Sequence, residues 1–126
     1  MTPTDTTPLR ILYVEDDGLT AHNTLAALAK VAETDVRHCR RWSEAEALVD
    51  VVDFDVAVLD VRLRGEEVFP IADLLAEMGV PIVFHSGHAQ SEELSEAYPG
   101  AAVLSKPAPI DRLVNALAER LRPRRA

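Results

Sequence analysis

The sequence predicts an α/β fold in which five parallel strands form one sheet with helices on both of its faces. Apolar stretches of strand length alternate five times with stretches of helical periodicity, and this alternation is typical of doubly wound proteins. The connections between the stretches are short, which fits right-handed crossovers between parallel strands. Residues Val56 to Leu59 are apolar at every position, as expected of a strand that is covered on both faces.

The individual elements follow one another in a regular order. Strands are expected at residues 9–14, 35–39, 56–59, 80–84 and 101–104, and helices from 19, from 43, at 68–78, at 91–97 and at 111–121. Leu25 and Leu28 lie on one stripe of the first helix. Ser43 stands three residues before Glu46, a capping-box spacing that predicts the start of the second helix. Gly79 is expected to end the third helix.

These elements predict one domain over residues 1–126. Its folded core is expected at residues 9–121, between a short polar N-terminal end and a basic C-terminal end. The length is close to the commonest size of a single compact domain.

Charge and composition narrow the classes of function. The chain of 126 residues carries a formal net charge of −8, which argues against direct nucleic-acid binding, because proteins that bind the phosphate backbone are usually basic. The C-terminal arginines at positions 120, 122, 124 and 125 are the exception, and they complement the dipole of the last helix. The sequence has no membrane-spanning stretch and no secretory signal pattern. Cys39 is the only cysteine, which fits a reducing cytoplasm, and we expect it to fill apolar space.

The predicted strands bring acids, a hydroxyl and a cation to one edge of the sheet. Glu15, Asp16 and Asp17 follow the first strand, Asp60 the third, Ser86 the fourth and Lys106 the fifth. Because ligands of open parallel sheets bind beyond the carboxyl ends of the strands, we expect the functional site at this edge.

The residue types at this edge indicate phosphoryl chemistry. Clustered carboxylates repel one another unless a cation lies between them, and an all-oxygen cluster suits Mg²⁺, which also binds phosphate oxygens. Lys106 and Ser86 would bind the oxygens of an incoming phosphoryl group. Asp60 is the lone acid on a central apolar strand, so it is the best candidate for a carboxylate nucleophile that becomes an aspartyl phosphate.

The segments at 14–17, 59–63, 86–87 and 106–107 together resemble the receiver domain of two-component response regulators. The resemblance covers residues 9–121 and implies a flavodoxin-like fold. It implies that Mg²⁺ is held by Glu15 through water, by Asp16 directly, and by Asp60 and the backbone carbonyl of Arg62. It also implies that a sensor histidine kinase or phosphotransfer protein phosphorylates Asp60, with Ser86 as the switch hydroxyl. Lys106 matches the family's lysine, and the bond to Pro107 is usually cis in this family.

Two positions depart from the family pattern. Val103 and Ala108 stand where receivers usually have aromatic residues, so the usual coupling through an inward-swinging ring is in doubt. The segments at 60–66 and 81–87 are similar to a subset of stand-alone receivers that lack this ring. Such receivers are often paired with kinases of the HWE type or with general-stress signalling. We also expect a downstream protein partner, and a homodimer stays open.

Two other functions stay open from the residues alone. A small Mg²⁺-dependent hydrolase or phosphatase would use Asp60 as its nucleophile, but such enzymes generally need a second acid two residues later, where this chain has Arg62. A pseudo-receiver would bind partners without being phosphorylated. The chain argues against this function because it keeps the acid pair, Asp60, Ser86 and Lys106.

The histidines on either side of Ser86 are expected to have no part in the chemistry. Neighbouring strand residues point to opposite faces, so His85 should point away from Ser86. We expect both His85 and His88 to be hydrogen-bonded or solvated.

Overall fold

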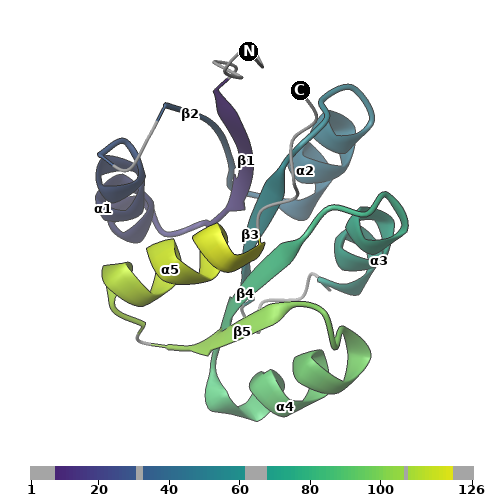
Figure 1. The fold of residues 1–126 in the computed structure, drawn as a ribbon. Helices are drawn as coiled ribbons and strands as arrows, with labels where there is room; N and C mark the ends of the chain where they lie inside the picture. The colour runs from purple at the N-terminus through teal and green to yellow at the C-terminus, as the bar shows by residue number, and fades with distance from the viewer. Residues whose placement is uncertain (1–7, 31–32, 62–67, 107, 121–126) are drawn as a thin grey trace, which may run out of the picture.

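The computed structural model describes residues 8–30, 33–61, 68–106 and 108–120. Five strands alternate with five helices in the described part of the chain (Figure 1). The strands are β1 (Leu9–Val14), β2 (Thr34–Cys39), β3 (Val56–Val61), β4 (Ile82–Ser86) and β5 (Ala102–Ser105). The helices are α1 (Gly18–Leu28), α2 (Trp42–Val49), α3 (Phe69–Glu77), α4 (His88–Ala97) and α5 (Ile110–Arg120).

All strands are parallel and lie in the order β2-β1-β3-β4-β5. The predicted five-stranded, doubly wound sheet is therefore confirmed. The order reverses at β1 and β3, so the carboxyl ends of these two strands form the crevice in which such sheets bind ligands.

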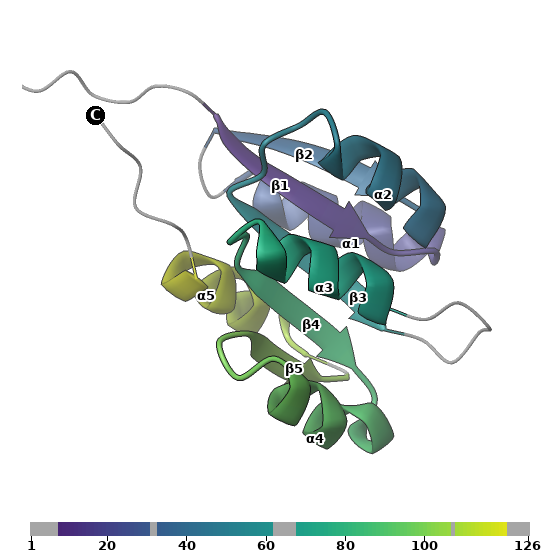
Figure 2. The ribbon, with the colours of Figure 1, turned by 90° about the vertical axis from the view of Figure 1, so that its right-hand side faces the viewer.

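Helices cover both faces of the sheet. α1 and α5 lie on one face, and α2, α3 and α4 lie on the other, in front of the sheet in Figure 2. β3 is buried at every position, as its uninterrupted apolar sequence predicted. Along β3, Val56 and Val58 pack toward α1 and α5, while Ala57 and Leu59 pack toward the other helices.

The start of α2 differs from the prediction. The helix begins at Trp42, and the Glu44 carboxylate accepts hydrogen bonds from the backbone N–H groups of Arg40 (3.0 Å) and Arg41 (3.1 Å). The predicted capping box between Ser43 and Glu46 is wrong, because Glu44 already satisfies the N–H groups at this end of the helix.

The third helix begins and ends as the sequence indicated. Pro70 lies in its first turn, where a missing N–H costs nothing. Gly79 follows the helix with a φ of 74°, a left-handed conformation that glycine adopts without strain.

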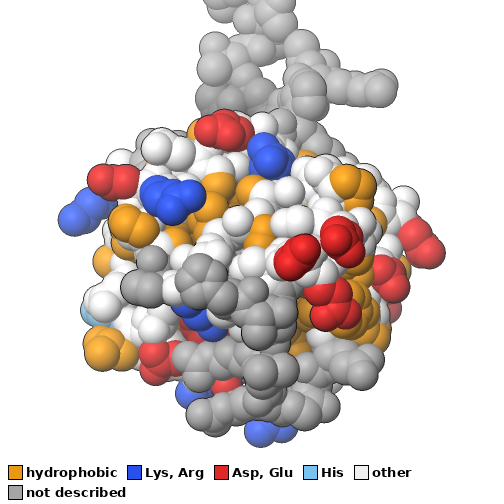
Figure 3. All heavy atoms as spheres, turned by 90° about the horizontal axis from the view of Figure 1, so that it is seen from below, with side chains coloured by type: hydrophobic (Ala, Val, Ile, Leu, Met, Phe, Trp, Pro, Cys, Tyr) orange, Lys and Arg blue, Asp and Glu red, His pale blue; other side chains and the backbone are white. Residues whose placement is uncertain are grey.

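Acidic side chains are prominent on the surface (Figure 3), as the net charge of −8 indicated. Seen from below, acidic side chains gather on one side of the molecule next to hydrophobic ones (Figure 3). Within the described ranges, every helix is too short or too polar to cross a membrane.

Candidate functional site

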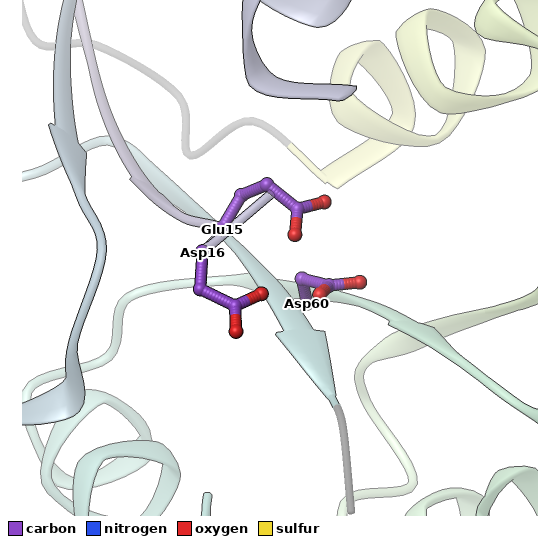
Figure 4. A group of neighbouring side chains, drawn as sticks. All are labelled: Glu15, Asp16 and Asp60. Carbon is purple, nitrogen blue, oxygen red and sulfur yellow. The ribbon is translucent and has the colours of Figure 1, made fainter. Parts of the chain in front are cut away.

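Three carboxylates converge where β1 and β3 end. Glu15 and Asp16 follow β1, and Asp60 lies in β3 (Figure 4). One oxygen from each carboxylate lies within 4.8 Å of the others. Glu15 and Asp60 are buried and Asp16 is half-buried. Like charges at this separation repel, so the cluster favours a bound cation.

Hydrogen bonds hold the acidic segment after β1 in place. The Glu15 carboxylate accepts from the backbone N–H of Asp17 (3.2 Å), and the Glu15 carbonyl accepts from His38 Nε2 (2.8 Å). Asp17 is the N-cap of α1, and its carboxylate accepts from the N–H (3.4 Å) and the hydroxyl of Thr20. Asp17 therefore has a helix-capping role, which leaves Glu15 and Asp16 to face Asp60.

Lys106 supplies the positive charge beside Asp60. Its Nζ lies 2.5 Å from Asp60 Oδ1 and donates to the carbonyl of Val61 at 3.4 Å. The backbone N–H of Lys106 donates to the carbonyl of Ser86 (2.8 Å), so β4 positions the lysine. A lysine in this position can neutralise both the carboxylate and a phosphoryl group bound to it.

Ser86 lies at the end of β4 and is fully buried. Its hydroxyl is hydrogen-bonded to the hydroxyl of Ser91 in α4 (3.0 Å). β4 alternates as a strand does, so His85 faces α1 and α5 while Ser86 faces α4. The expectation that these two neighbours point in different directions is confirmed.

His85 is closer to the chemistry than its sequence position indicated. It pairs with Asp60 in the sheet register, and its Nδ1 lies 3.8 Å from Asp60 Oδ1. Its Nε2 is buried without a hydrogen-bond partner among the described residues. The expectation that His85 is hydrogen-bonded or solvated therefore fails for Nε2, while the side chain as a whole is 19% exposed. Burial lowers the pKa of His85; Asp60 opposes that shift and Lys106 adds to it.

A cavity of about 190 Å³ opens beside Asp60 on the α1 and α5 side of the sheet. Its polar lining includes Tyr13, Thr20, Asn23 and His85. Burial raises the pKa of Tyr13 to about 12; a hydrogen bond with Thr24 opposes this shift, and nearby carboxylates including Asp60 add to it. The Tyr13 hydroxyl is therefore neutral and is not a base for the site.

The structure brings Glu15, Asp16, Asp60 and Lys106 together. It places Ser86 opposite Val61, the residue after Asp60, with the Ser86 hydroxyl hydrogen-bonded to Ser91 of α4. The predicted carbonyl ligand of Arg62, the Pro107 bond and the side chain of His88 lie outside the described residues. Sequence reasoning missed His85, Ser91 and Ser105 as neighbours of the site. The one available signal for His85 was its register opposite Asp60, which depends on how β3 and β4 pair.

Comparison with known proteins identifies the family. The family model of the response regulator receiver domain matches residues 11–118. A search of curated proteins finds no match.

Solved structures agree with the family model. The response regulator receiver protein of Sinorhizobium medicae WSM419 has 25% sequence identity and a TM-score of 0.77, covering 89% of this chain and 93% of its own. SdrG of Sphingomonas melonis Fr1 has 33% identity and a TM-score of 0.65, covering 88% and 94%. A CheY-like receiver domain protein of Methanospirillum hungatei JF-1 has 23% identity and a TM-score of 0.78, covering 90% and 93%, and shows the same fold. The chain therefore belongs to the response regulator receiver domain family, whose members are phosphoryl-accepting signalling switches rather than enzymes.

Proposed function

We propose that Asp60 is the phosphoacceptor and that Glu15, Asp16 and Asp60 hold Mg²⁺, joined by the backbone carbonyl of Arg62. The observation that carries this proposal is the position of Asp60. Its carboxylate is buried, belongs to a cluster of three acids within 4.8 Å, and has a lysine ammonium 2.5 Å away. An all-oxygen donor set of this kind fits Mg²⁺, which keeps part of its water shell and so leaves room for phosphate oxygens.

Each site residue has a separate role in phosphoryl transfer. An oxygen of Asp60 forms the new P–O bond as the P–N bond of a donor phosphohistidine breaks, and the imidazole leaves with the bonding electron pair. Mg²⁺ bound by the acids supplies charge neutralisation at the phosphoryl oxygens. Lys106 neutralises the charge of a further phosphoryl oxygen. The Ser86 hydroxyl donates a hydrogen bond to the phosphoryl group once that hydroxyl turns toward Asp60.

Acetyl phosphate provides the direct test. Wild type incubated with acetyl phosphate and Mg²⁺ should gain one phosphoryl group by intact mass, and EDTA should prevent the gain. Asp60→Asn should remain unlabelled, whereas Asp111→Asn, an exposed acid at the start of α5, should label like wild type. Equal labelling of Asp60→Asn and wild type would place the phosphoryl group elsewhere. Failure of wild type to label from acetyl phosphate and from a phosphohistidine donor would favour the pseudo-receiver.

The partners follow from this chemistry. We propose a sensor histidine kinase or phosphotransfer protein, of the HWE type, as the phosphoryl donor, and a downstream protein partner as the receiver of the signal. Support for the kinase type comes from the segments at 60–66 and 81–87 and from the missing aromatic at Val103. The net charge of −8 disfavours a direct nucleic-acid partner. We place the protein in the cytoplasm, where such donors present their phosphohistidine.

A further inference from the structure

Three serine hydroxyls form a hydrogen-bonded chain beside the phosphorylation site. Ser86 Oγ lies 3.0 Å from Ser91 Oγ, and Ser91 Oγ lies 3.3 Å from Ser105 Oγ. These serines come from β4, α4 and β5 respectively. The chain therefore ties the fully buried Ser86 to the helix and the strand that lie beside it.

Counting hydrogens shows which way these bonds run. Each hydroxyl has one hydrogen to donate and two lone pairs that accept. Ser91 donates its hydrogen to the backbone carbonyl of Gly87 at 3.1 Å. Ser91 can then only accept from Ser86 and Ser105, so the hydrogen of Ser86 is committed to Ser91.

That commitment competes with the role of Ser86 at a phosphorylated Asp60. To donate to a phosphoryl oxygen, Ser86 must give up its bond to Ser91, because it has a single hydrogen. A hydrogen bond to a charged phosphoryl oxygen is roughly twice as strong as one between neutral hydroxyls. Ser86 therefore binds the phosphoryl group in preference to Ser91 once Asp60 is phosphorylated. The strength of the bond to Ser91 determines how strongly the unphosphorylated position of the Ser86 hydroxyl is favoured.

We propose that Ser91 is a positioning residue that holds the Ser86 hydroxyl on α4 until Asp60 carries a phosphoryl group. The inference rests on the proposed function, since it needs a phosphoryl group at Asp60 to compete for Ser86. Ser91 lies in the first turn of α4. When Ser86 is released, Ser91 loses one of the two hydroxyls that donate to it, and Ser105 of β5 remains as the only one of the pair. The change at Asp60 thus reaches α4 and β5 through hydroxyls.

This route supplies what the missing aromatic residue would otherwise provide. Val103 of β5 is an aliphatic side chain that packs, partly buried, against the core on the side of α4. It has neither the size nor the polar group to report on Asp60. The hydroxyl chain connects the same strand to Ser86 with two hydrogen bonds.

Beryllofluoride, a mimic of a phosphoryl group, tests the proposal when titrated with Mg²⁺ and followed by amide NMR shifts. Ser91→Ala removes the acceptor that holds Ser86, so the apparent affinity for beryllofluoride should rise about three- to tenfold, the range of one neutral hydrogen bond. Ser91→Thr keeps a hydroxyl and should restore the wild-type affinity. Ser95→Ala, an exposed serine one turn further along α4, should change the affinity less than twofold. Alanine suits a helix, so the two alanine variants should remain folded.

A double-mutant cycle separates positioning from a general effect on α4. In a Ser86→Ala background, Ser91→Ala should no longer change the affinity, because the hydroxyl that it positions is gone. Equal affinity of Ser91→Ala and wild type, or the same increase in both backgrounds, would overturn the positioning role alone. Failure of wild type to bind beryllofluoride would instead overturn the proposed function, and with it this inference.

Discussion

Replacing Lys106 with methionine would leave the buried Asp60 carboxylate without its nearest cation. Lys106 Nζ lies 2.5 Å from Asp60 Oδ1, and the carboxylate side chain is 2% exposed. Removing one partner of a fully buried ion pair costs about 3–5 kcal/mol. The lysine side chain is 28% exposed, so water would replace part of the lost interaction, and we expect a loss of about 2–3 kcal/mol in the free energy of unfolding. For a domain of this size, such a loss lowers Tm by roughly 10 °C.

Urea unfolding in EDTA measures this loss directly. Lys30→Met, at an exposed position just after α1, is the matched control and should change the unfolding free energy by less than about 0.5 kcal/mol. Adding Mg²⁺ should stabilise Lys106→Met more than wild type, because the ion then supplies the charge that the lysine no longer provides. Asp60→Asn combined with Lys106→Met should recover most of the loss, since the Asp60 charge that Lys106 neutralises is then absent as well. A Lys106→Met variant as stable as wild type in EDTA would refute the reasoning.

Three further predictions concern the metal, the thiol and β5. Mg²⁺ at ten times its dissociation constant should stabilise wild type by about 1.4 kcal/mol in a thermal-shift assay, and Asp16→Asn should lose most of that gain; an undiminished gain would move the ion away from Asp16. Burial raises the pKa of Cys39 to about 11, above the value near 8.5 of an unfolded thiol. The stability that comes from keeping the thiol neutral is therefore fully present below about pH 8.5 and is lost as the pH rises toward 11. Urea unfolding of Cys39→Ala should show a weaker decline over that pH range than wild type, and an identical decline would exclude the thiol as its cause. Val103→Ala should cost about 1 kcal/mol of unfolding free energy through lost packing and leave acetyl phosphate labelling unchanged; lost labelling in the folded variant would show that Val103 takes part in the switch.

The fold could be predicted from the sequence because hydrophobic patterning decides it. The uninterrupted apolar run of β3 indicated burial on both faces, and the acids at the ends of β1 and β3 follow from where parallel strands end. The start of α2 could not be predicted, because Glu44 and Glu46 are both able to accept from a helix N-terminus, and only the structure shows that Glu44 does so.

Features that depend on contacts between segments distant in the sequence could not be predicted from the sequence either. The approach of His85 to Asp60 depends on the register of β3 against β4. The hydroxyl chain depends on α4 placing Ser91 between Ser86 and Ser105, which are 19 residues apart in the sequence. Periodicity carries no information on either contact, because it describes each element by itself.

The position of the phosphoryl group is the most direct test of the account. Protein labelled with acetyl phosphate and Mg²⁺ is treated with borohydride, which reduces an acyl phosphate to an alcohol, and the modified residue is then located by peptide mass spectrometry. We predict that homoserine replaces aspartate at Asp60 alone, with Glu15, Asp16 and Asp17 unchanged. Reduction at any of those three acids, with Asp60 intact, would contradict this prediction.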